Sequence, residues 1–302
     1  MTDYTPLLGA IEAGGTKFVC MAARGPNDVL ARVRLPTRAP RETLTRAVDF
    51  FRGLGERVQA VGIGSFGPVD LDPASDTWGH ITSTPKAGWQ NVDFAGIVGE
   101  ALSVPVAFET DVNAAALGEQ RWGAAKGLPS CLYLTAGTGI GGGAVIDGRP
   151  LHGLIHPEMG HVRVPRALGD AFAGSCVYHG DCLEGMVSGP ALEGRTGRPA
   201  VDLGDEDPVW DLVAHYLAHA ITGFALTLSP HRVILGGGLM HRIHLFPVIR
   251  QRLRSLLNGY VQHPLLREDI DGYVVPPGLG DDAGVLGALA LALDAASLDK
   301  SQ

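Results

Sequence analysis

A group of cysteine and histidine residues in the second half of the chain has the composition of a metal site. Cys176, His179 and Cys182 fall within seven residues, and His161 lies fifteen residues before the first of them. Four nitrogen or sulfur ligands with no open position are typical of a closed, tetrahedral structural zinc site. A Cys176–Cys182 disulfide and two unrelated thiols are the alternatives, although neither explains the interposed histidine. We therefore expect one zinc ion per chain at this loop.

Two turns rich in glycine and threonine, one in each half of the chain, could bind phosphate. They are residues 12–17 and 135–143, and each joins two apolar, strand-like runs. Backbone N–H groups and threonine hydroxyls in such a turn form an anion-binding concavity, and a plain β-turn is the alternative. A third glycine cluster, residues 236–238, follows an apolar strand, where a nucleotide base or ribose could approach the backbone.

Two common nucleotide-binding motifs are excluded. Residues 62–67 and 137–142 both fit the pattern G-x-G-x-x-G, but neither segment opens a helix, and the second runs straight into a strand. A dinucleotide site needs a helix at that point, so that its N-terminus faces the pyrophosphate. The P-loop pattern G-x₄-G-K-[ST] does not occur in the sequence.

Asp111 has the position of a catalytic carboxylate. It falls between a predicted strand, residues 104–109, and a predicted helix, residues 114–122. A carboxylate at such a junction projects from a rigid element into a cleft. Aspartate before an alanine-rich helix is also a good N-cap, so the sequence alone leaves both roles open.

The elements that must position these residues alternate along the chain. Apolar runs predict strands at 7–11, 16–22, 29–35, 60–64, 104–109, 131–135, 144–146 and 232–235. Helical patterns cover 41–53, 114–122, 209–228 and 246–258, and a last helix starts at about 282. Each half opens with two strands around a glycine turn, which predicts two related α/β lobes facing a cleft.

Composition limits the possible partners and location. The chain has 302 residues, and its 24 basic and 32 acidic side chains give a net charge of −8, which argues against nucleic acid as a partner. The N-terminus has no secretory pattern, and the longest apolar stretch, about residues 283–293, is too short to span a bilayer. We expect a cytoplasmic protein with no membrane segment, in which Cys20 and Cys131 are buried thiols.

Taken together and in this order, the motifs resemble the ROK family of sugar kinases over essentially the whole chain. The matching segments are Gly14-Gly15-Thr16-Lys17, Gly64-x-x-Gly67-Pro68, Asp111-x-Asn113, Thr135-x-Gly137-Thr138-Gly139, Glu158-x-x-His161 and Gly236-Gly237-Gly238. Glu12, residues 82–89 and 156–161, and the Cys-x-x-His-x-x-Cys set resemble the fructokinase branch of that family. The resemblance implies a two-lobed, actin-like (ribonuclease-H-like) ATPase fold, ATP with Mg²⁺ as phosphoryl donor, and a homodimer.

Site residues follow from the resemblance position by position. Asp111 matches the general base of the family. The sugar contacts would be Thr110, Asn113, Glu158, His161, Glu184 and Gly67, with a helix cap as the alternative for Thr110 or Asn113. The phosphate and nucleotide contacts would be Gly14, Gly15, Thr16, Lys17, Thr135, Gly137, Thr138, Gly139, Gly236, Gly237 and Gly238.

The resemblance also implies a reaction and a division into lobes. We expect transfer of the γ-phosphoryl group of ATP to the 6-hydroxyl of fructose. The alternatives are a mannokinase or glucokinase of the same family, or a sugar-sensing regulator without turnover. The N-terminal lobe would comprise residues 1–112 with the C-terminal helix 282–302, and the C-terminal lobe residues 113–281 with the zinc loop.

Overall fold

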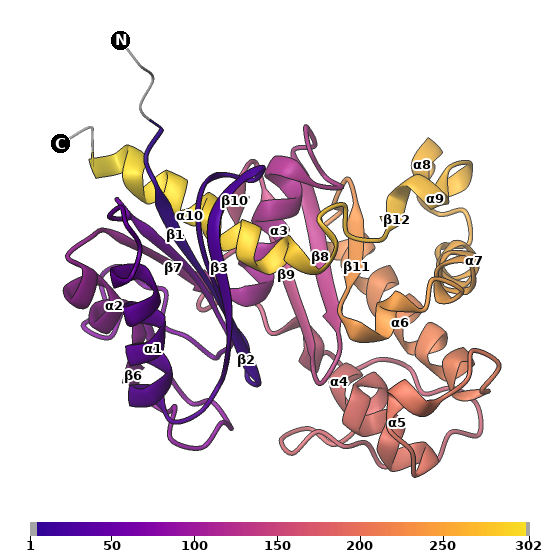
Figure 1. The fold of residues 1–302 in the computed structure, drawn as a ribbon. Helices are drawn as coiled ribbons and strands as arrows, with labels where there is room; N and C mark the ends of the chain where they lie inside the picture. The colour runs from indigo at the N-terminus through magenta and orange to yellow at the C-terminus, as the bar shows by residue number, and fades with distance from the viewer. Residues whose placement is uncertain (1–4, 300–302) are drawn as a thin grey trace.

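Residues 5–299 are described by a computed structural model, and they contain two five-stranded sheets (Figure 1). The first has the order β3-β2-β1-β4-β7. Its strands are β1 (Leu8–Ala13), β2 (Lys17–Gly25), β3 (Asp28–Pro36), β4 (Val61–Ser65) and β7 (Val106–Thr110). The first three strands are antiparallel, whereas β4 and β7 run parallel to β1.

The second sheet repeats this plan, with the order β10-β9-β8-β11-β12. Its strands are β8 (Ser130–Ala136), β9 (Ile140–Ile146), β10 (Arg149–Pro150), β11 (Val233–Gly236) and β12 (Val274–Val275). Again an antiparallel hairpin is followed by parallel strands. A small two-stranded sheet, β5 (His80–Ile81) and β6 (Val92–Asp93), completes the strands of the described residues. The two α/β lobes predicted from the sequence are confirmed.

Helices cover the outer face of each sheet. In the N-terminal half, α1 (Pro40–Arg52) and α2 (Phe94–Leu102) share a hydrophobic core with β1, β2 and β4. In the C-terminal half, α6 (Val209–Thr227) and α7 (Leu245–Leu257) pack on β8 and β11. Strand alternation explains this arrangement, because Ile11 of β1 faces α1 and α2 while Ala10 faces the opposite side.

Two helices pack between the sheets, α3 (Asp111–Trp122) and α10 (Ala283–Asp299) (Figure 1). α10 packs on the inner face of β1 and β2 and on α3, and α3 in turn contacts β8 and β9 of the second sheet. Glycine makes this crossing possible, because a Cβ atom at Gly118 would lie 2.8 Å from the backbone nitrogen of Gly287. In the structure the last helix therefore packs on the N-terminal sheet.

The remaining helices are short. They are α4 (Leu183–Val187), α5 (Gly189–Thr196), α8 (Pro264–Arg267), α9 (Ile270–Tyr273) and the 3₁₀ turns η1 (Met159–His161), η2 (Ala200–Asp202), η3 (Gly238–His241) and η4 (Gly280–Asp282). Residues 1–4 and 300–302, which the predicted lobe boundaries include, lie outside the described part of the chain. No helix within residues 5–299 is long and apolar enough to cross a membrane.

One predicted boundary is wrong. The sequence predicts a glycine turn reaching to residue 143 and a strand from 144, but β9 already begins at Ile140. Its glycines are needed because the first turn of α3 crosses the strand closely. A Cβ atom at Gly143 would lie 2.5 Å from the backbone nitrogen of Asn113. Cys20 and Cys131 are buried as predicted, and burial raises the pKa of each thiol to about 12.

Candidate active site and metal centre

A cavity of about 320 Å³ lies where the ends of the two sheets meet. Its lining residues from the N-terminal half and α3 are Glu12, Lys17, Asp111, Val112 and Ala115. From the C-terminal half it is lined by Tyr133, Thr135, Leu235, Gly236, Gly237, Gly238, Met240, His241, Pro277, Gly280, Asp281 and Gly284. We refer to it as the interlobe cavity.

The interlobe cavity gathers some of the predicted nucleotide residues. Lys17, Thr135 and the three glycines 236–238 line it. Gly237 has a φ of +87°, and a Cβ atom there would lie 2.6 Å from Oγ1 of Thr135, so the backbone can turn here only with glycine.

The other predicted phosphate residues lie in the two hairpin turns and do not line the cavity. They are Gly14, Gly15, Thr16, Gly137, Thr138 and Gly139. The first turn is closed by a hydrogen bond from the nitrogen of Gly14 to the oxygen of Lys17, 2.9 Å. The second is closed by one from the nitrogen of Gly137 to the oxygen of Gly139, also 2.9 Å. Each turn is therefore closed by its own backbone hydrogen bond.

Asp111 is the first residue of α3 and not its N-cap. The cap is Thr110, whose Oγ1 accepts a hydrogen bond from the nitrogen of Asn113 at 3.1 Å. Asp111 Oδ1 accepts one from the nitrogen of Val112 at 2.9 Å, and the carboxylate faces the cavity. Thr110 and not Asp111 is therefore the N-cap, so the Asp111 carboxylate is available for another role.

The electrostatics of the cavity favour a protonated Asp111 at low pH. Desolvation by burial is the largest cause that raises the pKa of Asp111 to about 7, and the negative charges of Glu12 and Glu158 raise it further. Loss of solvent also raises the pKa of Glu12 at the end of β1, against the opposing effect of Lys17. Two partly buried carboxylates that line one cavity suit a divalent cation, which would offset their repulsion.

Thr110 and Asn113 are enclosed by the chain itself. Asn113 is 1% exposed, and its Nδ2 donates to Oε1 of Glu109 at 3.1 Å. Its Oδ1 accepts from the nitrogen of Ala144 at 3.1 Å, which ties the first turn of α3 to β9. The sequence did not single out Glu109, the buried carboxylate that organises this junction.

The remaining predicted sugar residues do not line the interlobe cavity. Glu184 Oε2 accepts a hydrogen bond from the nitrogen of Ile140 at 3.1 Å, beside the second glycine turn. Glu158 Oε2 lies 4.0 Å from Nε2 of His161. Partial burial and the charge of Glu184 raise the pKa of Glu158. Gly67 follows β4 and joins Pro68 through a cis peptide bond.

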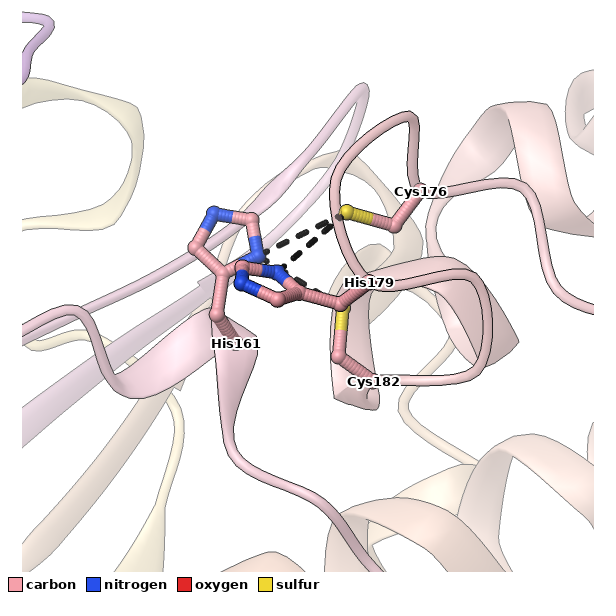
Figure 2. Close-up of side chains that lie close together, drawn as sticks. All are labelled: His161, Cys176, His179 and Cys182. Atoms are coloured by element: carbon pink, nitrogen blue, oxygen red, sulfur yellow. Dashed lines mark hydrogen bonds between the residues drawn. The ribbon is translucent and has the colours of Figure 1, made fainter.

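The four predicted metal ligands converge on one point (Figure 2). Nδ1 of His161 lies 3.5 Å from Sγ of Cys182 and 3.7 Å from Sγ of Cys176. Nδ1 of His179 is also 3.7 Å from Sγ of Cys176, and all four ligand atoms lie within 4.8 Å of one another. Ligands around a tetrahedral zinc ion at ordinary bond lengths are separated by about 3.3–3.8 Å. The donor set and its spacing therefore fit zinc.

Backbone hydrogen bonds form the loop that carries these ligands. The nitrogen of Gly180 donates to the oxygen of Cys176 at 2.9 Å, and the nitrogen of Ser175 donates to the oxygen of Gly185, also at 2.9 Å. A Cβ atom at Gly174, whose φ is +90°, would lie 2.7 Å from the nitrogen of Asp181. All four cysteines are free thiols, so the disulfide alternative is not adopted.

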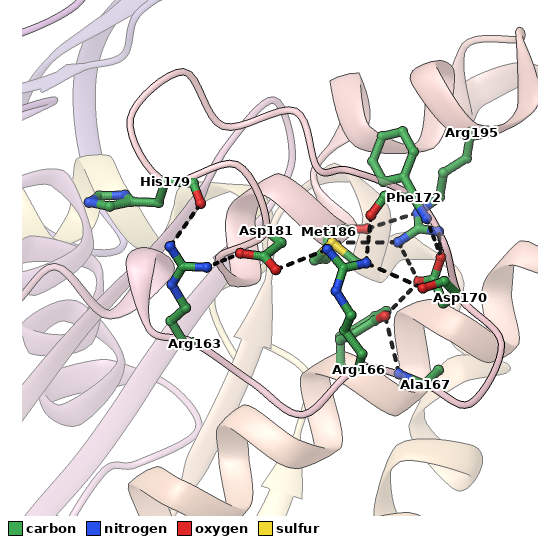
Figure 3. A network of polar contacts seen from close by, with 10 residues as sticks. Arg163, Arg166, Ala167, Asp170, Phe172, His179, Asp181, Met186 and Arg195 are labelled. Carbon is green, nitrogen blue, oxygen red and sulfur yellow. Dashed lines mark hydrogen bonds and ion pairs between the residues drawn. The ribbon is translucent and has the colours of Figure 1, made fainter.

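An arginine and aspartate network supports the same loop (Figure 3). Asp181 pairs with Arg163 and lies 2.9 Å from Arg166. Arg163 also donates to the backbone oxygen of His179 at 3.1 Å. Further from the loop, Asp170 pairs with Arg195 at 2.8 Å, and both side chains are less than 10% exposed. The paired residues are 15 to 25 positions apart in the chain, so the sequence held no local signal from which this network could be predicted.

Asp281 and Asp282 lie in η4, directly before α10. Asp281 lines the interlobe cavity and accepts a hydrogen bond from Nε2 of His241 at 2.9 Å. Asp282 pairs with Arg32 at 2.5 Å. Both acidic residues are thus held by partners that are distant in sequence.

The architecture is that of the actin-like, ribonuclease-H-like ATPases, with two α/β lobes around a cleft. Residues 8–295 match the ROK family, and the chain belongs to that family. A Bacillus subtilis relative is 50% identical over 286 residues, covering 95% of each chain. The fructokinase of Pediococcus pentosaceus is 44% identical over 95% of this chain and 97% of its own. The fructokinase of Zymomonas mobilis is 42% identical over 98% and 99%.

Solved structures share the same architecture. The ROK hexokinase of Thermus thermophilus superposes with a TM-score of 0.76 at 28% identity, covering 98% of this chain and all of that one. A ROK glucokinase of Streptomyces griseus, solved in complex with glucose and AMPPNP, gives 0.75 at 27% identity, covering 95% and 99%.

Proposed function

We propose that the protein is an ATP-dependent fructokinase that transfers the γ-phosphoryl group to the 6-hydroxyl of fructose. The observation that carries the proposal is the placement of Asp111. Its carboxylate lies in the interlobe cavity, which Lys17 and the glycines 236–238 also line. Its pKa is raised to about 7, in part by the negative charge of Glu158. Fructokinases at 42–44% identity over nearly the full chain support the choice of sugar.

Asp111 acts as the general base. In its ionised form it accepts the proton of the acceptor hydroxyl as the phosphoryl group is transferred, and a pKa near the operating pH suits that task. The rigid N-terminus of α3, capped by Thr110 and tied to β9 by Asn113, holds the carboxylate in place. The sugar site is assigned to Gly67, Glu158, His161 and Glu184, whereas Thr110 and Asn113 support it through their hydrogen bonds within the chain.

The nucleotide binds along the interlobe cavity. Lys17 and Thr135 face the phosphates, and the Gly14–Thr16 and Gly137–Gly139 turns present backbone N–H groups at the mouth of the cleft. The glycines 236–238 allow the nucleoside to approach the backbone. Glu12 is the carboxylate best placed to hold Mg²⁺, which when bound would neutralise the charge of the phosphates.

The second metal site is structural. His161, Cys176, His179 and Cys182 would hold one zinc ion with no open position. His161 is also next to Glu158, so the ion would fix part of the sugar site. We further propose the lobe division at residues 112 and 282, a homodimer and a cytoplasmic location, all of which rest on the family resemblance.

The test is a coupled assay of ADP release over several hexoses. We expect a higher kcat/KM for fructose than for glucose, with mannose in between. A preference for glucose or mannose of about tenfold or more would replace the fructokinase assignment with a glucokinase or mannokinase. Sugar binding without ADP release would instead support the sugar-sensing regulator.

A further inference from the structure

One loop of the C-terminal half, residues 151–158, contacts the N-terminal half of the chain through two histidines. Nε2 of His152 lies 2.6 Å from Oε2 of Glu109, near the end of β7. Nε2 of His156 accepts a hydrogen bond from the backbone nitrogen of Val69 at 3.1 Å, across 87 residues of sequence. His156 is 4% exposed, whereas His152 keeps 43% of its side chain exposed. His156 therefore makes the buried contact between this loop and the other lobe.

The His156 ring lies between two predicted sugar-contact segments that belong to opposite lobes. On one side, a Cβ atom at Gly67 would lie 3.7 Å from both Cε1 and Nε2 of the ring. On the other side, Nδ1 of the ring lies 3.5 Å from Oε1 of Glu158. One imidazole thus spans the distance from the turn after β4 to the carboxylate that follows β10.

The protonation state of the ring follows from its contacts. Burial lowers the pKa of His156, which keeps the imidazole neutral near pH 7. A neutral imidazole has one N–H group and one lone pair. Because the Val69 N–H donates to Nε2, the proton lies on Nδ1, the nitrogen that faces Glu158. The ring can therefore contact both lobes at once, because Nε2 accepts from the Val69 N–H while the N–H at Nδ1 faces the Glu158 carboxylate.

We propose that His156 is a positioning residue for the sugar, which holds Glu158 and the turn at Gly67 at a fixed separation across the cleft. The inference rests on the proposed function, since Gly67 and Glu158 are the sugar contacts assigned there. Loss of the ring nitrogens should weaken fructose binding, because Glu158 then loses its alignment with the opposite lobe. The nucleotide residues are on other segments and keep their geometry.

Two substitutions separate shape from hydrogen bonding. His156→Phe keeps a ring of similar size but has neither nitrogen, so KM for fructose should rise by about tenfold. His156→Gln retains an amide oxygen that can accept from the Val69 N–H, so its KM for fructose should lie between those of the parent and the phenylalanine variant. KM for ATP should stay within about twofold of the parent in both.

The controls distinguish positioning from general destabilisation. His219→Gln on α6, a half-buried histidine whose ring packs on His215, should leave both KM values unchanged. Thermal unfolding of each variant is measured in parallel, and if the phenylalanine variant does not fold, the glutamine variant decides. The inference is overturned if the variants at position 156 leave the KM for fructose unchanged. It is also overturned if they raise the KM for ATP as much as the KM for fructose. A parent that releases no ADP with fructose contradicts the proposed function and this inference with it.

Discussion

The Asp111 side chain is free to act as a base because its neighbour performs the structural task at this junction. Thr110 caps α3, so replacing Asp111 leaves the cap intact. We expect Asp111→Asn to fold and to bind sugar, but to lose turnover by about 10²–10⁴-fold, since an amide cannot accept the hydroxyl proton. Steady-state kcat together with the melting temperature checks this, and a kcat within about threefold of the parent would remove Asp111 from the role.

The raised pKa of Asp111 gives the reaction a pH dependence. Because the base must be ionised, kcat/KM should rise with pH and level off above the folded-state pKa of about 7. Asp111→Asn should lose this inflection. If kcat/KM of the parent changed by much less than about tenfold between pH 5.5 and 8.5, the assignment would be contradicted.

Asp111 should also make stability depend on pH, but in the opposite direction to kcat/KM. An unfolded aspartate has a pKa of about 3.8, below the folded value of about 7, so between these pH values the folded state binds more protons. The free energy of unfolding contributed by Asp111 therefore decreases as pH rises from about 4 to about 7. Denaturant unfolding of parent and Asp111→Asn across this range should show the difference narrowing at low pH.

At the scale of elements, the 277–281 segment is held against α3 by one buried carboxylate. Glu119 is fully buried, and its two oxygens accept hydrogen bonds from the nitrogens of Ala124 (2.6 Å), Gly278 (3.0 Å) and Leu279 (2.9 Å). Pro277, Gly280 and Asp281 of this segment line the interlobe cavity. α3 therefore positions both the proposed base at its start and one wall of the proposed nucleotide site at its end.

Glu119→Gln should disturb that wall. The amide N–H₂ group would face a backbone N–H donor, which costs about 1–3 kcal/mol. We expect a lower melting temperature and a raised KM for ATP, with KM for fructose nearly unchanged. Glu100→Gln, an exposed position on α2, is the matched control. An effect confined to the fructose KM would show that Glu119 does not support the nucleotide side.

The metal loop is a second element whose effect should be separable. Cys176→Ser removes one of four ligands, so zinc content should fall below one per chain and the melting temperature should drop. KM for fructose should rise more than KM for ATP, because His161 adjoins Glu158. Val177→Ala, at an 83% exposed position of the same loop, should change neither. Parent protein purified without chelator but containing no zinc would refute the site.

At the scale of the whole molecule, the packing of α3 and α10 between two similar sheets creates the cleft. α3 contacts strands of both sheets, α10 packs on α3 and on the N-terminal sheet, and glycines at their crossing let the backbones approach. The ends of β1 and β8 are thereby brought to one cavity, with Glu12 and Thr135 on opposite walls. The site exists only because the lobes are joined in this way.

The sequence by itself determined the features that depend on neighbouring residues. Strand alternation, helical periodicity and glycine turns follow from local backbone preferences, which is why the predicted elements occur with shifts of only a few residues, chiefly at β9. Several shorter elements, such as α2 and α5, were not predicted. The Cys176–Cys182 ligand spacing is local as well. The family motifs added the order of the site residues, but not their geometry.

Tertiary structure alone decided which residues meet. Thr110 rather than Asp111 caps α3, Glu119 binds backbone groups about 160 residues away, and His156 reaches Val69 in the other lobe. The raised pKa of Asp111 likewise arises from loss of solvent and from Glu12 and Glu158, which are distant in sequence. Desolvation and charge interactions depend on distances in the folded structure. Separation along the sequence does not determine those distances, which are fixed only when the two lobes pack around α3 and α10.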